Sequence, residues 1–172
     1  MTGQFDGPKE NTERIDLKPI VPTDFEVPLT LTTNHTVLRP LGPEHNQSDY
    51  EAWTSSVEHI RATPGFGPPR RWPIAELSLE ENQRDCEIHQ KHFDERVGFT
   101  YTVLDRLDEQ RVLGCVYIYE DQTGEQDVEV RSWVRSDRAE LDWEVWSAVT
   151  EWLQTVWPFN QVKYLRRQRL DD

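Results

Sequence analysis

Residues 127–157, DVEVRSWVRSDRAELDWEVWSAVTEWLQTVW, decide the fold of this chain. In the first part, valines recur with the period of two that is typical of a strand with one buried face: Val128, Val130 and Val134. In the second part, apolar residues recur at helical spacing along one face: Leu141, Val145, Val149, Trp152 and Val156. The stretch therefore predicts a strand that leads through a short turn into a long amphipathic helix.

The turn between this strand and this helix has the place of an anion site. The first N–H groups of a helix have no partner within it and point outward, so a strand–turn–helix unit commonly binds phosphate. Here the turn carries Glu140 and Asp142, and the last glycine of the chain is Gly124. A carboxylate about 5 Å from a phosphate oxygen costs roughly 3 kcal/mol at an effective dielectric near 20. Both residues suit the dipole of their own helix, so we expect the helix to fill its anion site with its own side chains.

The rest of the chain predicts further strands and two more helices. Residues 25–41 are expected to be extended, and residues 48–61 to form a helix that begins at Ser48. Residues 63–73 hold four prolines and form a loop, and Ser78 and Glu81 form the capping box of a helix to about residue 96. Strands at 99–104 and 112–119 form a hairpin, and a short strand follows at 162–165. This order predicts an α+β fold: one mixed, mostly antiparallel central sheet with helices on both faces.

Composition limits the domain count and the partners. The 172 residues include seven Trp, six Phe and five Tyr, enough apolar area for a packed core. We expect a disordered polar tail at residues 1–13 and a single domain at 14–172. A formal net charge of −13 argues against nucleic acid as a partner. The longest apolar run, 112–119, is too short to span a bilayer and no signal-like segment begins the chain, so no membrane association and a cytoplasmic location are expected.

The chain resembles the GNAT superfamily of N-acetyltransferases over about residues 25–165. The resemblance is carried by the order and spacing of short phrases: VLRPL at 37–41, FTYTV at 99–103, VLGCV at 112–116, and SWV at 132–134 before the amphipathic helix. It implies a GNAT-like acyl-CoA N-acyltransferase fold that lacks the last helix and strands of the family. It also implies acetyl-CoA as the cofactor and transfer of its acetyl group to an amine.

The resemblance also implies roles for individual residues. In the family, the turn after the fourth strand carries Gln/Arg-x-x-Gly-x-Gly/Ala, and its backbone N–H groups hold the coenzyme A pyrophosphate. The matching positions here, without the glycines, are Val134, Arg135, Arg138, Ala139, Glu140 and Asp142. The residues implied to contact the acceptor are Trp53, His59, Phe66, Trp72 and Tyr117. Glu129 stands where some members place a general base, and its alternative is a cross-strand ion pair with Arg131 or Arg111.

Three further groups of residues have a structural interpretation. Cys86, His89 and His92 recur every three residues on a helix, a splayed spacing that favours surface polar residues and no metal site. The thiols of Cys86 and Cys115 are expected to be buried and reduced. The cationic residues Arg70, Arg71, Arg166, Arg167 and Arg169 are expected to be solvated.

Trp143, Trp146 and Trp157 fall partly off the core face of the long helix. They either form an exposed apolar patch or pack under the loop at 63–73. A homodimer is expected through this patch or through an open sheet edge. The sequence leaves two functions open: acetyl transfer with Glu129 as base, or a non-catalytic relative that binds a small-molecule or protein partner.

Overall fold

The computed structural model describes residues 17–70 and 72–170. Six strands form one sheet in the order in which they occur along the chain. They are β1 (Leu31–Thr32), β2 (Thr36–Pro40), β3 (Gly98–Asp105), β4 (Asp108–Glu120), β5 (Val128–Val134) and β6 (Val162–Tyr164). All neighbouring strands pair antiparallel except β5 and β6, which pair parallel. The predicted α+β fold with a mixed, mostly antiparallel sheet is confirmed. The expected tail at residues 1–13 lies outside the described residues.

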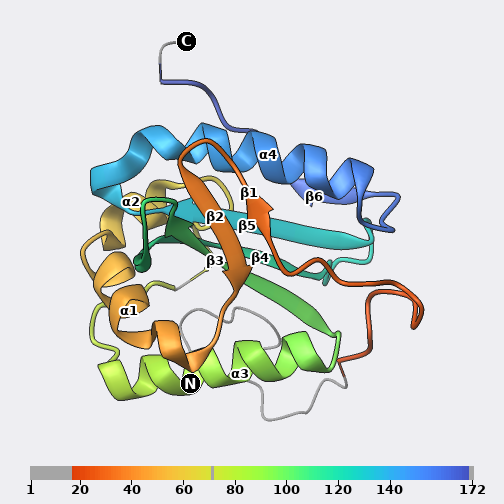
Figure 1. The fold of residues 1–172 in the computed structure, drawn as a ribbon, viewed down its shortest axis with the longest axis horizontal. Helices are drawn as coiled ribbons and strands as arrows, with labels where there is room; N and C mark the ends of the chain where they lie inside the picture. The colour runs from red at the N-terminus through yellow and green to blue at the C-terminus, as the bar shows by residue number, and fades with distance from the viewer. Residues whose placement is uncertain (1–16, 71, 171–172) are drawn as a thin grey trace.

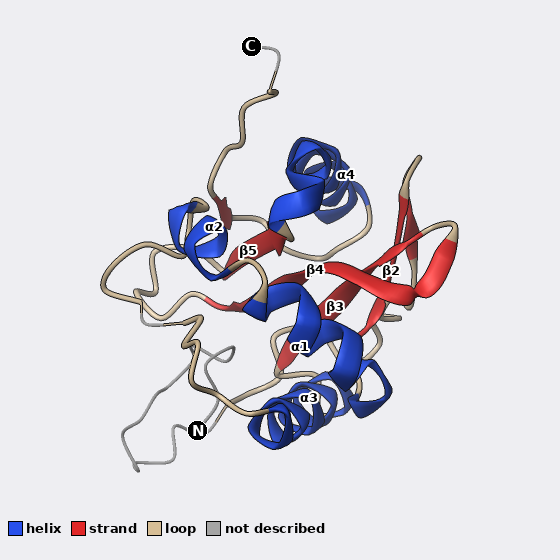
Figure 2. Ribbon diagram, turned by 90° about the vertical axis from the view of Figure 1, so that its left-hand side faces the viewer, coloured by secondary structure: helices blue, strands red, loops and turns tan. Residues whose placement is uncertain are grey.

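The helices cover both faces of this sheet. They are η1 (Pro43–His45), α1 (Asn46–Thr54), α2 (Val57–Ala62), α3 (Leu79–Asp94), η2 (Ser136–Leu141) and α4 (Asp142–Thr155). Figure 1 shows the sheet between α4 on one side and α3 on the other. Turned by a quarter, the molecule shows α1 beside α3, across the sheet from α4 (Figure 2). This layering follows from strands such as β3, which is buried over nearly its whole length and therefore needs cover on both faces.

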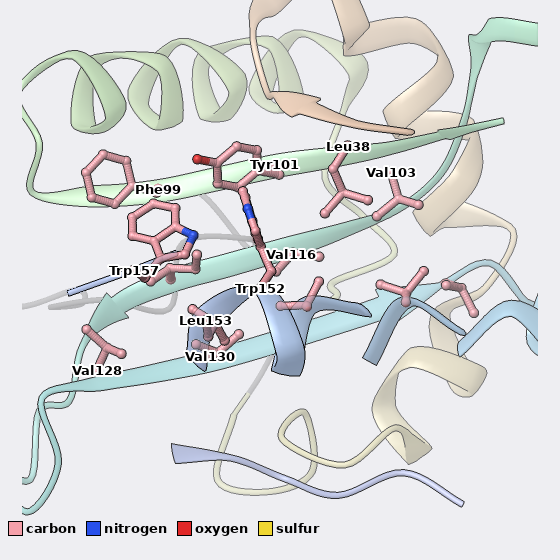
Figure 3. Packing of buried hydrophobic residues seen from close by; sticks show 14 of the residues in the cluster. Leu38, Phe99, Tyr101, Val103, Val116, Val128, Val130, Trp152, Leu153 and Trp157 are labelled. Carbon is pink, nitrogen blue, oxygen red and sulfur yellow. The ribbon is translucent and has the colours of Figure 1, made fainter. Parts of the chain in front are cut away.

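Each face of the sheet has its own hydrophobic core. The core under α4 contains Val128, Val130, Val145 and Val149, the valines and helical positions on which the sequence prediction rests. Figure 3 shows Trp152 and Trp157 among the residues of this core, near Phe99 and Tyr101 of β3. The second core, under α1 and α3, contains Trp53, Trp72 and Trp133.

The predicted helix at 48–61 is wrong in its start and its continuity. The chain forms two helices that are interrupted at Ser55 and Ser56. Ser48 is not the cap, because α1 already begins at Asn46 and the Ser48 hydroxyl accepts a hydrogen bond from the N–H of Val112 at 2.8 Å. A serine whose hydroxyl is bound to a neighbouring strand cannot cap its own helix.

The helix α3 begins as predicted, but its two histidines His89 and His92 are not on the surface. The Ser78 hydroxyl accepts from the N–H of Glu81, and the Glu81 carboxylate accepts from the N–H of Ser78. His89 and His92, expected to be surface polar residues, are buried, whereas Cys86 is buried as its thiol was expected to be. His89 Nδ1 lies 2.7 Å from the hydroxyl of Thr100 on β3, so this face of α3 packs on the sheet through hydrogen bonds rather than apolar contacts alone.

Three further properties of the described residues concern metal-ligating groups, the two cysteine thiols and membrane-spanning helices. Within the described ranges, no group of three or more His, Cys, Asp or Glu side chains is arranged to hold a metal ion. Cys86 and Cys115 are free and buried, and burial raises the pKa of both thiols. None of the described helices combines the length and apolarity needed to cross a membrane.

Candidate functional site

The candidate site lies where β5 and β6 part. The two strands pair at only three positions, from Val128 with Val162 to Val130 with Tyr164. β5 continues to Val134, whereas the chain after Tyr164 leaves the sheet as the C-terminal arm, residues 165–170. Residues 131–134 of β5 therefore have no strand partner on that side among the described residues. We call the space between residues 131–134 and the arm the fork.

The side chain of Arg167 fills this fork. Its guanidinium donates to the carbonyl oxygen of Ser132 at 2.6 Å and to that of Leu165 at 2.8 Å. Its Nε donates to Asp142 Oδ2 at 2.9 Å. Arg167 is only 4% exposed, so the expectation that it is solvated is wrong. A buried guanidinium needs an anionic partner and several acceptors, and the fork provides them from β5, the arm and α4.

Three backbone N–H groups of the turn between β5 and α4, those of Ser136, Arg138 and Asp142, are hydrogen-bonded within the protein. The N–H of Ser136 donates to the hydroxyl of Ser56 at 2.9 Å, across the break between α1 and α2. The N–H groups of Arg138 and Asp142 donate to carbonyl oxygens three residues earlier in the turn. The turn is a 3₁₀ helix with non-helical backbone angles at Arg138, and these three amides bond within the protein instead of facing an anion.

The acidic side chains of the turn are paired with arginines. Glu140 accepts from Nε of Arg138 at 2.8 Å, and this hydrogen bond lowers the pKa of the Glu140 carboxyl. Burial raises the pKa of Asp142, and the facing Arg167 opposes that effect. Arg135 pairs with Asp137 at 2.6 Å. The carboxylates thus occupy the predicted positions, but each is paired with an arginine. Two of these arginines, Arg135 and Arg138, had been matched to coenzyme-binding positions, and Arg167 had been expected to be solvated.

The remaining two coenzyme positions contribute no charge. Val134 is buried at the end of β5 under α4. Ala139 lines a groove of about 230 Å³ together with Glu140, Asp142 and His59. The structure therefore brings His59, one of the residues implied to contact the acceptor, to the turn implied to bind the coenzyme.

The other four residues implied to contact the acceptor lie in the core. Trp53, Phe66, Trp72 and Tyr117 are all buried, and their rings pack against one another. The centroids of Trp53 and Trp72, for example, are 5.8 Å apart. These four residues belong to the core under α1 and α3 and are closed to solvent.

Glu129 lies in a cluster of cations. Its carboxylate pairs with the guanidinium of Arg70, with Nε of Arg131 at 3.5 Å and with Nζ of Lys163 at 3.3 Å. Arg111 instead pairs with Asp137. The expected ion pair with Arg131 is thus present, but it lies within β5 and not across strands, and it is extended by Arg70 of the loop and Lys163 of β6. Strand periodicity does not predict the contacts of Arg70 and Lys163 with Glu129, because both depend on which segments the fold places beside β5.

The three tryptophans do not form an exposed patch. Trp157 is 5% exposed and belongs to the core under α4, packed against Trp152 rather than under the loop at 63–73. Trp143 is half-buried, with the guanidinium of Arg169 4.3 Å from its ring centroid. Trp146 is half-buried beside Tyr164. The C-terminal arm covers the part of α4 that lies off its core face. A homodimer through an exposed tryptophan patch, one of the two routes expected from the sequence, therefore loses its structural basis.

The key residue that sequence reasoning missed is Arg167. Its only signal was the run RRQR at 166–169, in which one arginine of three is buried and two are exposed. Ser56 was also missed as the group that binds the turn, because the sequence predicted an unbroken helix there and offered no local signal of the break.

The arrangement is that of a GNAT acetyltransferase fold. A ribosomal-protein-S5-alanine acetyltransferase from Vibrio fischeri matches with a TM-score of 0.57 and 13% identity, over 73% of this chain and 67% of that one. A putative ribosomal-protein-serine acetyltransferase from Vibrio cholerae matches with a TM-score of 0.60 and 12% identity, over 83% and 76%. Apo FdhC, a nucleotide-linked sugar GNAT, matches with a TM-score of 0.56 and 11% identity, over 84% and 76%.

No family model and no curated protein matches the sequence. At identities this low, the structural matches establish the common fold alone, and the activity has to be argued from the residues of this chain.

Proposed function

We propose that this chain is a non-catalytic GNAT-fold binding protein, and that it does not hold acetyl-CoA in the manner implied by its resemblance to the family. The observation that carries the proposal is Arg167 in the fork. The resemblance implies that the pantetheine of the coenzyme lies along the strand from Asp127 to Val134, and within this range Arg167 binds the carbonyl oxygen of Ser132. A ligand there has to displace a buried guanidinium and leave Asp142 without its cation.

The turn gives the proposal independent support. A pyrophosphate held by a helix N-terminus needs free backbone N–H groups, and those of Ser136, Arg138 and Asp142 already have acceptors. Rearranging them costs several hydrogen bonds before the first contact with the coenzyme forms. Because Glu140 and Asp142 are paired with arginines, they repel phosphate less than the sequence alone suggested. The main obstacle to the coenzyme is therefore that protein groups already fill its site, and not the negative charge of the turn.

Acetyl transfer from acetyl-CoA to an amine is the second candidate. It is favoured by the edge of β5 at residues 131–134, which no described strand covers, and by the acetyltransferase fold itself. In that case the arm swings out and Glu129, on β5, acts as the base. This candidate requires Arg167 and the arm to leave the fork when the coenzyme binds.

Calorimetric titration with acetyl-CoA at low and high salt separates the two candidates. We expect no binding to the wild-type chain at millimolar ligand in either buffer. The variant Arg167→Ala tests whether the guanidinium is the obstacle, and Arg166→Ala, which removes an exposed arginine of the same arm, is the matched control. Micromolar binding by the wild-type chain at physiological salt would overturn the proposal and establish the second candidate's first requirement.

A further inference from the structure

The C-terminal arm, residues 165–170, is attached to the rest of the protein by side chains. Residues 165–169 form neither helix nor strand, and Figure 2 shows the chain leaving the sheet between α2 and α4. Within the described residues, the backbone groups of 166–170 make no hydrogen bond with the rest of the chain. Segments with few backbone hydrogen bonds open most readily, so the arm can leave its place while the domain stays folded.

Two arginines anchor the arm, and each has a matching place on the domain. Arg167 enters the fork, where it donates to the carbonyl oxygen of Ser132 at 2.6 Å and to the carboxylate of Asp142 at 2.9 Å. Arg169 lies with its guanidinium 4.3 Å from the ring centroid of Trp143. A carboxylate, a carbonyl oxygen and an indole face are all good partners for a guanidinium. These partners belong to β5 and to the start of α4, so the domain itself carries two places for arginine side chains.

The other residues of the arm define the spacing of these anchors. Arg166 and Gln168 are both exposed, and neither makes a hydrogen bond or an ion pair in the part of the chain that the structure describes. The arm thus presents two arginines separated by one residue, in a segment without regular structure. The fork also favours arginine over lysine, because Arg167 uses three of its nitrogens on three different acceptors.

The arm fills only part of the groove in which it lies. A groove of about 600 Å³ is lined by Pro64, Trp143 and the arm, and a second one of about 230 Å³ is lined by His59, Ala139 and the end of the arm, among others. Volumes of this size accommodate further side chains. An external segment with larger side chains gains contacts that the arm lacks, which favours it in competition with a linked segment.

We propose that the fork and the ring of Trp143 form a docking site for an extended Arg-x-Arg segment of a partner protein, and that the arm occupies this site until the partner displaces it. The site selects a cationic partner, because Asp142 supplies an anion, Ser132 an acceptor and Trp143 an aromatic face. The formal net charge of −13 attracts the same class of partner over a longer distance. This inference rests on the proposed binding function and names the class of its partner.

The test uses the full chain as the wild type and as a double variant, Arg167→Ala combined with Arg169→Ala, whose arm lacks both anchors. The probe is the peptide LARQRL, blocked at both ends, which repeats the arm with alanine in place of Arg166. The control peptide LARRQL has the same composition and charge but places its arginines side by side. Arg166→Ala, which leaves both anchors in the arm, is the matched control for the double variant.

Binding is measured by NMR through the indole N–H of Trp143 and the backbone N–H of Trp133, which shares its peptide bond with the Ser132 carbonyl. We expect LARQRL to shift both signals of the double variant in a saturable way. Its apparent affinity for the wild type and for Arg166→Ala should be about tenfold weaker, because an arm at an effective concentration of about 1 mM competes with a peptide that dissociates at about 100 μM. LARRQL should bind the double variant about fivefold more weakly, since one of its two arginines misses its place.

Thermal unfolding extends the test to a double variant that folds poorly. LARQRL should raise the unfolding midpoint of this variant more than LARRQL does, because a ligand that binds only the folded chain stabilises it. Arg169→Ala alone alters an exposed residue and leaves Arg167 in the fork. Its affinity for LARQRL should lie between those of the wild type and the double variant.

The inference is overturned if the double variant binds neither peptide, if it binds both equally, or if the wild type binds LARQRL as tightly as the double variant does. A wild-type dimer in sedimentation that the double variant fails to form makes a second copy the occupant, and overturns the assignment to another protein. The peptide titration contains no coenzyme, so its failure leaves the acetyl-CoA result untouched. Acetyl-CoA binding by the wild-type chain removes the proposed function and is measured separately.

Discussion

The ion pair between Arg167 and Asp142 should contribute measurably to folding stability. Removing one partner of a buried pair typically costs about 3–5 kcal/mol, because the other charge is left uncompensated. Asp142 is 24% exposed, so water moderates this cost, and we expect Arg167→Ala to lower the free energy of unfolding by about 3 kcal/mol. The substitution also leaves the carbonyl oxygens of Ser132 and Leu165 without their donor. Asp142→Asn should cost about as much, about 3 kcal/mol, because it leaves the more deeply buried guanidinium of Arg167 without its anion.

A double-mutant cycle measured by urea unfolding isolates the pair itself. The variant with both substitutions should be more stable than the two single losses added together, by a coupling energy of about 1–2 kcal/mol. Arg166→Ala, on the exposed neighbour in the arm, should change stability by less than about 0.5 kcal/mol. If Arg167→Ala costs no more than this control, or if the coupling energy is zero, the fork is not closed by Arg167 in solution and the argument for the binding protein loses its main support.

Three other predictions test the fold around the site. Burial lowers the pKa of His92 to about 4 from 6.5, so the unfolded chain binds the proton more tightly than the folded chain. The free energy of unfolding should therefore fall by up to about 3 kcal/mol as the pH drops from about 6.5 to about 4. The variant His92→Gln should flatten this part of a curve of unfolding free energy against pH. Gly114→Ala places a methyl group 2.0 Å from the carbonyl oxygen of Trp133, and thermal unfolding should show a loss of about 3 kcal/mol, while an unchanged melting temperature would contradict the close pairing of β4 and β5. Ser78→Ala removes the cap of α3 and should cost about 1 kcal/mol in urea unfolding, with no loss indicating that the capping box is not formed.

The layers of this fold were predictable from the sequence because each depends on local periodicity. Valines at every second position place Val128 and Val130 on one face of a strand, and the Ser78 capping box marks the start of α3 without any tertiary information. The break at Ser55 and Ser56 was not predictable in this way. Its reason is a contact across 80 residues of sequence, in which the Ser56 hydroxyl binds the N–H of Ser136.

The candidate site was predictable in its position but not in its partners. The sequence placed Glu129 on a strand and Glu140 and Asp142 in the turn that follows this strand, because consecutive segments of a strand–turn–helix unit stay in order in any fold of this class. Which cations meet these carboxylates depends on the path of the loop and the arm. Both segments lack the regular periodicity that would place their side chains, so Lys163 and Arg167 became visible only in the structure.

The structure also changes the reason why we expect no coenzyme binding. From the sequence, the obstacle was electrostatic: Glu140 and Asp142 would repel a pyrophosphate. In the structure Glu140 is paired with Arg138 and Asp142 with Arg167, so most of that repulsion is compensated. What remains is that the site is already filled, since the fork holds a buried guanidinium and three amides of the turn have acceptors within the protein. An electrostatic obstacle would weaken with added salt, whereas an occupied fork would not. Acetyl-CoA affinity that stays undetectable at both salt concentrations therefore supports the occupied fork, and binding that appears only in one of them returns the explanation to charge.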